Sequence, residues 1–192
     1  SRCMSDPFDI DVARVRQSFG RSAGEYDAAA VLQTRVRDEL LERLDLVRLE
    51  PGVVLDLGAG TGHASLALKR RYRSSQVVAL DLAEGMLREA GRRQTLLRRF
   101  GRVCAHAASL PLRDASVDLV FSSLMLQWSD ELDRALGELH RVLAPGAMLT
   151  LASFGPQTLR ELREAWSTVD DAPHVNPFVD VHDLGSALAR AG

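Results

Sequence analysis

The residues best placed to do chemistry are glycines and acids that follow two short apolar runs. The stretch VVLDLGAGTGHASLAL, residues 53–68, has the pattern of a buried strand, a glycine loop and the start of a helix. Glycine has no side chain, so a G-x-G-x-G loop lets a ligand approach the backbone closely. Asp56 ends the first run, and Asp81 stands near the end of the next run, QVVALDL. This arrangement is typical of a site for a nucleotide-like ligand.

The glycine spacing limits which ligand the loop can hold. The dinucleotide fingerprint G-x-G-x-x-G needs its third glycine at position 63, but His63 stands there and the third glycine is Gly62. A P-loop needs a Lys-Ser or Lys-Thr pair after the glycines, and none follows. An anionic Asp56 would repel a pyrophosphate, although it could equally be a capping carboxylate, and Asp81 could accept both hydroxyls of a ribose. The pattern favours a cationic ligand with a ribose and no phosphate, such as S-adenosylmethionine.

Alternating strands and helices must position these residues. An apolar stripe before residue 50 predicts a helical N-terminal segment, and the Pro51-Gly52 pair then interrupts it. Strands that alternate with helices imply a doubly wound α/β fold with a mainly parallel sheet. We expect strands at 53–57, 76–82, 102–107, 116–123 and 147–154, and helices that end near 72, begin near 83 and span 131–143, where Pro145-Gly146 follows.

The chain is predicted to have three parts. Residues 1–50 form a helical segment that covers the ligand site, residues 51–154 form the α/β core, and residues 155–192 form a helical substrate cap. Sheets of this kind often carry more than five strands. The sequence therefore leaves open whether the final strands lie beyond Gly192.

Composition adds a few constraints. A chain of 192 residues, 46% of them hydrophobic, can bury one sizeable core. The net charge of −2 gives no reason to expect nucleic acid, and no apolar run is long enough for a bilayer. The two cysteines lack the spacing of metal ligands, so we expect a reduced, cytoplasmic protein without a metal. A monomer is the expected state.

The motifs resemble those of the class I S-adenosylmethionine-dependent methyltransferases, which have a Rossmann-like fold. VLDLGAGTG is similar to their first motif, ALDLAEGML to their second, and LPLRDASVDLVFSS to their third and fourth. The resemblance covers residues 53–154 and implies S-adenosylhomocysteine as the product. It also implies roles for single residues: Gly58, Gly60 and Gly62 lining the methionine moiety, Asp81 on the ribose, Leu82, Met86, Ala107 and Ser109 around the adenine, and Ser122 under the methionine end. Asp56, Ala59 and Thr61 are expected to belong to the same cofactor site.

One position departs from the family pattern. Many members carry an aspartate after the third strand that accepts a hydrogen bond from the adenine amino group, and this chain has His106 there. A neutral histidine could accept through one ring nitrogen, or backbone groups could suffice.

The flanking stretches indicate what is methylated. FGRSAGEYDAAAVLQ, SSLMLQW and FGPQTLRELREAW with PHVNPF are similar to the malonyl-[acyl-carrier-protein] O-methyltransferases of biotin synthesis. The resemblance implies methyl transfer to the free carboxylate of a malonyl thioester, on acyl carrier protein or coenzyme A. A carboxylate is ionised at neutral pH, so no general base is needed, but an arginine should hold it. Arg163 is the candidate and Arg160 the alternative.

Further substrate contacts are expected from several segments. Tyr26 and Phe19 would cover the cofactor, although Tyr26 could instead anchor the N-terminal segment. Gln127 and Trp128 follow the fourth strand, at the edge of the sheet where ligands gather. His174 and Asn176 could line the thioester path or be turn residues. Two basic runs, at 69–73 and 92–102, could dock an acidic carrier protein or be solvated surfaces.

Other functions stay open at this point. The FGPQTLREL, NPF and LQW patterns also resemble complex I assembly factors of the same fold that hydroxylate an arginine. A non-catalytic protein that keeps the fold is a third possibility, with His106 as its only sign. A methyltransferase acting on another small molecule is the broadest alternative.

Overall fold

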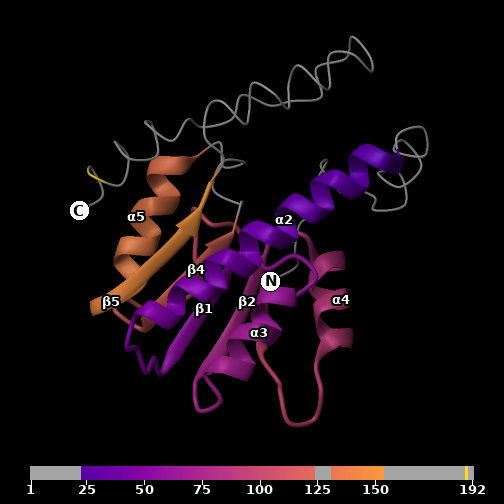
Figure 1. Cartoon of the computed structure of the whole chain (residues 1–192). Coiled ribbons are helices and arrows are strands. Elements are labelled where there is room, and N and C mark those ends of the chain that lie inside the picture. The colour runs from indigo at the N-terminus through magenta and orange to yellow at the C-terminus, as the bar shows by residue number, and fades with distance from the viewer. Residues whose placement is uncertain (1–22, 124–130, 154–188, 190–192) are drawn as a thin grey trace.

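The computed structural model describes residues 23–123, 131–153 and 189 of the chain (Figure 1). The described elements follow one another as strands and helices, as expected. They are α2 (Ala23–Arg43), the short 3-10 helix η2 (Leu44–Leu46), β1 (Val53–Leu57), α3 (His63–Arg71), β2 (Gln76–Asp81), α4 (Glu84–Arg93), β3 (Gly101–Cys104), β4 (Val117–Ser123), α5 (Leu132–Val142) and β5 (Leu143–Ala152).

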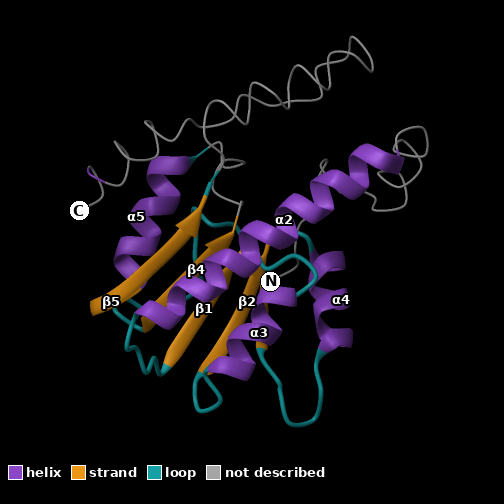
Figure 2. Cartoon of the chain, viewed as in Figure 1, coloured by secondary structure: helices purple, strands orange, loops and turns teal. Residues whose placement is uncertain are grey.

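The strands form one parallel sheet in the order β3-β2-β1-β4-β5. The order reverses between β1 and β4, so the carboxyl ends of these strands border a crevice. In Figure 2, α2 crosses the front of the sheet, on the side that also carries α3 and α4. The predicted doubly wound α/β fold is therefore confirmed for the described part of the chain.

Strict alternation along β1 decides which side chains face which helices. Leu55 and Leu57 pack in a core cluster with α5, whereas Val54 packs in a second cluster with α2, α3 and α4. Successive side chains on a strand point to opposite faces, so Asp56 shares the α3 side with Val54. This placement determines what Asp56 can contact.

Two strand boundaries differ from the prediction. β3 ends at Cys104, not at 107, because the chain turns at His106, whose carbonyl accepts from Ser109 N at 3.0 Å. β5 begins at Leu143, not at 147, so Pro145-Gly146 lies inside the strand, although α5 does end before it. The register with β4 shifts at this point, and Gly146 has a φ of 78°, which indicates a bulge that tolerates the proline.

One other feature bears on an expectation from composition. None of the helices in the described ranges is long and apolar enough to cross a membrane.

Candidate functional site

The glycine loop between β1 and α3 has three glycines in the left-handed region. Gly58, Gly60 and Gly62 have φ values of 74°, 52° and 80°. A Cβ on Gly60 would meet nothing within 4 Å, whereas a Cβ on Gly62 would lie 2.7 Å from the Cβ of Ala90 in α4. Gly60 therefore leaves open space for a ligand. Gly62 instead allows α3 to pack closely against α4, which is a different role from the expected ligand contact.

The loop has few free backbone donors. Gly58 N and Ala59 N both donate to the carbonyl of Leu80, at 2.8 and 3.0 Å. Gly60 N donates to Asp81 Oδ2 at 2.8 Å, and Gly62 N donates to Ala59 O at 2.9 Å. A phosphate site needs such N–H groups to point at the anion. Because this loop uses them internally, its geometry agrees with a ligand that has no phosphate.

The Asp81 carboxylate lies at the carboxyl end of β2 and joins two loops. Its Oδ2 accepts from Gly60 N, and its Oδ1 accepts from Ala83 N, both at 2.8 Å. A carboxylate oxygen has two lone pairs, so each oxygen can still accept from a ligand hydroxyl. The next side chain, Leu82, is 52% exposed although it is large and apolar, and Met86 on α4 is half-buried. An acceptor beside open apolar surface suits a ribose that carries a base.

Asp56 does not face the ligand side of the loop. It is 2% exposed and accepts a hydrogen bond from Ser65 Oγ on α3 at 2.5 Å. The pKa of Asp56 is raised to about 7, because burial, and to a lesser extent the charge of Asp81, outweigh the Ser65 hydrogen bond, which lowers it. The expectation that an anionic Asp56 repels a pyrophosphate is therefore wrong, because the carboxyl is turned into the core and only partly ionised at neutral pH.

The turn after β3 places its side chains on two sides. His106 and Ser109 are exposed, whereas Ala107 is 8% exposed and packs in the core cluster with α5. Ala107 can therefore meet a ligand only through its backbone. His106 Nδ1 accepts a hydrogen bond from Ala108 N at 3.1 Å, so this ring helps to shape the turn.

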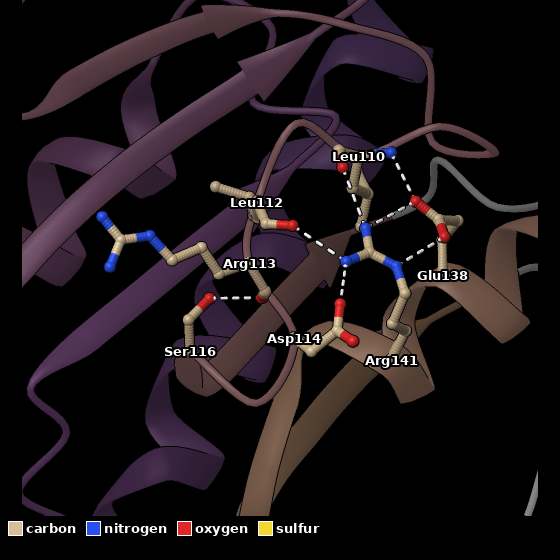
Figure 3. A network of polar contacts seen from close by, with 7 residues as sticks. All are labelled: Leu110, Leu112, Arg113, Asp114, Ser116, Glu138 and Arg141. Atoms are coloured by element: carbon tan, nitrogen blue, oxygen red, sulfur yellow. Dashed lines mark hydrogen bonds and ion pairs between the residues drawn. The ribbon is translucent and has the colours of Figure 1, made fainter.

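Arg141 of α5 holds the crossover between β3 and β4, and sequence reasoning did not find it. Figure 3 shows its guanidinium between the crossover and Glu138. It donates to Leu110 O at 3.0 Å, Leu112 O at 2.9 Å and Asp114 Oδ1 at 2.5 Å. This crossover contains no helix, so its backbone groups need partners from elsewhere.

Glu138 completes this network. It accepts from Leu110 N at 2.7 Å and from Arg141 Nε at 2.8 Å. The hydrogen bond from Arg141 lowers the pKa of Glu138 to about 2. The network therefore anchors the chain one residue after Ser109. The missing helix in the crossover was the only sign of it in the sequence.

Two buried hydroxyls lie near the carboxyl ends of β4 and β5. Ser122 is 1% exposed, and neither its Oγ nor that of Ser153 has a hydrogen-bond partner among the described residues. Buried polar atoms normally have partners, so such groups in a ligand site call for explanation. The Ser122 hydroxyl, the open space at Gly60 and the exposed Leu82 together fit a ligand with polar ends and an apolar base.

Several predicted residues cannot be placed. The side chain of Tyr26 is outside the described part, although its backbone belongs to α2. The other expected substrate residues also lie outside the described ranges: Phe19, Gln127, Trp128, Arg160, Arg163, His174 and Asn176.

The predicted carrier-docking run at 92–102 begins at the glycine loop, where Arg93 Nε donates to Thr61 O at 2.8 Å. Arg98 and Arg99 lie in the segment between α4 and β3, which projects past the end of the sheet where the strands begin (Figure 1). Phe100, the residue that follows them, reaches the glycine loop, since a Cβ on Gly62 would lie 3.3 Å from its ring. Docking of a carrier protein at Arg98 and Arg99 therefore stays a prediction.

Comparison with known families decides the class of this fold. A family model described as a methyltransferase domain matches residues 55–151, which is half of the chain. The chain belongs to the methyltransferase-domain family. The matched residues include the glycine loop, Asp81 and the crossover held by Arg141.

Individual relatives agree with this assignment. The malonyl-[acyl-carrier protein] O-methyltransferase of Methylovorus sp. (strain MP688) is 53% identical over 98% of this chain and 66% of the relative. That of Halorhodospira halophila is 52% identical over 97% of this chain and 63% of the relative. The chain thus spans slightly less than two thirds of their length. A solved methyltransferase of Thermotoga maritima has the same fold, with a TM-score of 0.66 at 21% identity over 91% of this chain and 79% of that one.

Proposed function

We propose that this chain is the main part of an S-adenosylmethionine-dependent enzyme that methylates the free carboxylate of a malonyl thioester on acyl carrier protein, an early step of biotin synthesis. The 53% identity to a named malonyl-[acyl-carrier protein] O-methyltransferase, over 98% of this chain, carries the proposal. Malonyl-coenzyme A is the alternative form of the same substrate. We infer a monomeric protein that works in the cytoplasm, where such thioesters are made.

S-adenosylmethionine, when bound, supplies an electrophilic methyl group on a sulfonium. The described residues would bind and orient it at the carboxyl ends of β1, β2 and β4. Gly60 admits the methionine part, Asp81 accepts from the ribose hydroxyls, and the buried Ser122 Oγ bonds to the methionine end. These groups would hold the reacting atoms in line, which is the largest contribution a protein makes to a simple displacement.

The acceptor needs orientation more than activation. The malonyl carboxylate is ionised at neutral pH, so its oxygen can attack the methyl carbon without a base. A planar guanidinium can hold a carboxylate by two parallel hydrogen bonds, and Arg163 is our candidate for this contact. The products are the malonyl methyl ester, which no longer carries a charge at that end, and S-adenosylhomocysteine.

Two measurements test the proposal. Calorimetry with S-adenosylmethionine should show binding, and its absence would remove every methyltransferase assignment. A methyl-transfer assay on malonyl-carrier protein and on malonyl-coenzyme A should then show product. A methyltransferase that binds the cofactor but modifies neither thioester would have a different acceptor.

Arg163 can be tested in the same assay. Arg163→Ala should raise the KM for the malonyl thioester at least tenfold and leave cofactor affinity unchanged, because the guanidinium would contact only the acceptor. Arg160→Ala is the matched control on the same segment. If Arg160→Ala is the harmful change and Arg163→Ala is not, the carboxylate contact belongs to Arg160.

A further inference from the structure

The His106 side chain has a defined proton position. Its Nδ1 accepts from the backbone N–H of Ala108 at 3.1 Å. Each imidazole nitrogen has a single lone pair in the ring plane, so a nitrogen that accepts cannot carry the proton. The neutral ring must therefore carry its hydrogen on Nε2, where it can only donate. His106 is exposed, and no described residue bonds to its Nε2.

The strand order places His106 beside the base of the ligand. The open space at Gly60 follows β1, and Asp81 ends β2. A ligand with its amino-acid part at Gly60 and its ribose on Asp81 extends across the sheet from β1 toward β3, the next strand in the order. Ala105 N donates to Asp81 O at 3.1 Å, so the turn that begins after β3 lies directly beside Asp81. The base therefore falls between the exposed Leu82 and His106.

We propose that His106 determines base specificity by donating from Nε2–H to N1 or N7 of the bound adenine. This inference rests on the proposed function, since it assumes an adenosyl ligand. A carboxylate at this position could only accept, and it would select the exocyclic amino group. His106 instead presents a hydrogen-bond donor, so the chain recognises an acceptor atom of the base. The side chain is a specificity residue and takes no part in methyl transfer.

Calorimetry with analogues of S-adenosylhomocysteine tests whether His106 donates a hydrogen bond to the base or accepts one from it. The probes are the parent compound, its 1-deaza and 7-deaza forms, and its N6,N6-dimethyl form. In the unmodified chain one deaza analogue should bind about fivefold more weakly than the parent, the value expected for one neutral hydrogen bond. Dimethylation of the amino group should change the affinity less than that. Equal binding of the parent and both deaza forms would overturn the proposal.

Two variants separate specificity from structure. His106→Ala should lose the difference in affinity between the parent and that deaza analogue, called the deaza penalty below, and bind all the analogues alike. His106→Asp keeps an acceptor for Ala108 N but has no donor, so it should lose the deaza penalty and gain one for the dimethyl form. An unchanged deaza penalty in His106→Ala would show that another group makes the contact.

Nitrogen NMR gives a reading that does not depend on any ligand. The free chain should show His106 as the neutral tautomer with hydrogen on Nε2, and an Nδ1–H tautomer would overturn the proposal. Calorimetry with the parent compound distinguishes a failure of the proposed function from a failure of the proposed role of His106. No binding of the parent would refute the proposed function, whereas parent binding without a deaza penalty would refute only the role of His106.

Discussion

Two loops border the same site, and they are held in place in different ways. The glycine loop after β1 is shaped by its own positive φ angles and by bonds to Leu80 and Asp81, at the end of the neighbouring strand. The crossover after β3 is anchored by Glu138 and Arg141, which lie 28 to 31 residues later in the chain. The first loop therefore depends on backbone conformation, and the second depends on side chains of a distant helix.

This difference predicts how each loop fails. A substitution in the glycine loop strains the backbone or overpacks a helix contact, so it should lower the free energy of unfolding of the whole fold. A substitution of the anchor leaves the crossover backbone unstrained but without partners, so it should loosen one side of the site. The experiments below test this contrast and the residues around it, beginning with the largest expected effect.

Gly62→Ala should be the most damaging change. Its Cβ would lie 2.7 Å from Ala90 Cβ and 3.0 Å from Ala90 Cα, at a φ of 80°. Overpacking and a left-handed alanine together should lower the free energy of unfolding by about 3 kcal/mol. Gly60→Ala is the matched control: its Cβ meets open space, so the loss should be about 1 kcal/mol, but cofactor binding should weaken more. Urea unfolding and calorimetry would show whether the two variants differ in this order.

Arg141→Met should loosen the crossover. The change removes the donors to Leu110 O and Leu112 O and leaves Glu138 without its partner. We expect a lower melting temperature, faster hydrogen exchange at the Leu110 amide, and cofactor affinity reduced about fivefold. Arg134→Met is the control, because in the described part of the chain Arg134 pairs with the exposed Glu131 rather than with the crossover. Equal exchange at Leu110 in both variants would contradict the anchoring role.

Asp56 should make stability depend on pH. Its pKa is about 7 in the folded protein, against 3.8 as the ordinary value. Between these two values the folded state binds more protons than the unfolded state, so the free energy of unfolding should fall as the pH rises from about 4 to about 7. Asp56→Asn should remove this slope.

Ser65→Ala is a second test of the same carboxyl. It removes the hydrogen bond that favours the ionised form, so the slope should extend to higher pH. Denaturation midpoints measured from pH 4 to pH 9 check both variants. A slope in Asp56→Asn equal to that of the unmodified chain would assign it to another group.

Ser122→Ala should separate binding from folding. In the described part of the chain the Oγ is buried without a partner, so its removal should leave stability unchanged or raise it slightly. Cofactor affinity should fall about fivefold, the value of one hydrogen bond. Ser116→Ala is the control, because it loses a bond to Arg113 O, away from the ligand side, and should leave affinity alone. Full affinity in Ser122→Ala would remove Ser122 from the site.

Charge reversal at Arg98 and Arg99 should have the smallest effect on cofactor binding. An acidic carrier protein that docks on this basic run would be repelled, so methyl transfer to malonyl-carrier protein should slow. Arg93→Glu is the contrasting variant, because Arg93 Nε donates to Thr61 O in the glycine loop at 2.8 Å. It should weaken cofactor binding. An unchanged carrier-dependent rate in the Arg98 and Arg99 variants would remove that face as the docking site.

Much of the fold could be predicted because its signals are local. The apolar run of β1, the three glycines and the acid at the end of β2 are close in sequence, and their spacing already excluded a dinucleotide or a triphosphate. β3 and β5 were less well bounded. The end of β3 depends on a turn made by the His106 side chain, and the start of β5 depends on a bulge against β4, which no short window of sequence contains.

By itself, the sequence determined the alternation of strands and helices, the glycine loop and the position of Asp81 at the end of β2, because periodicity and backbone conformation are local properties. Tertiary structure decided the rest. Helix α3 covers Asp56 and makes it a buried carboxyl, α4 makes Gly62 a packing residue, and α5 supplies the anchor Arg141. The direction of a side chain depends on which element packs against it, and that partner is set by the assembled sheet.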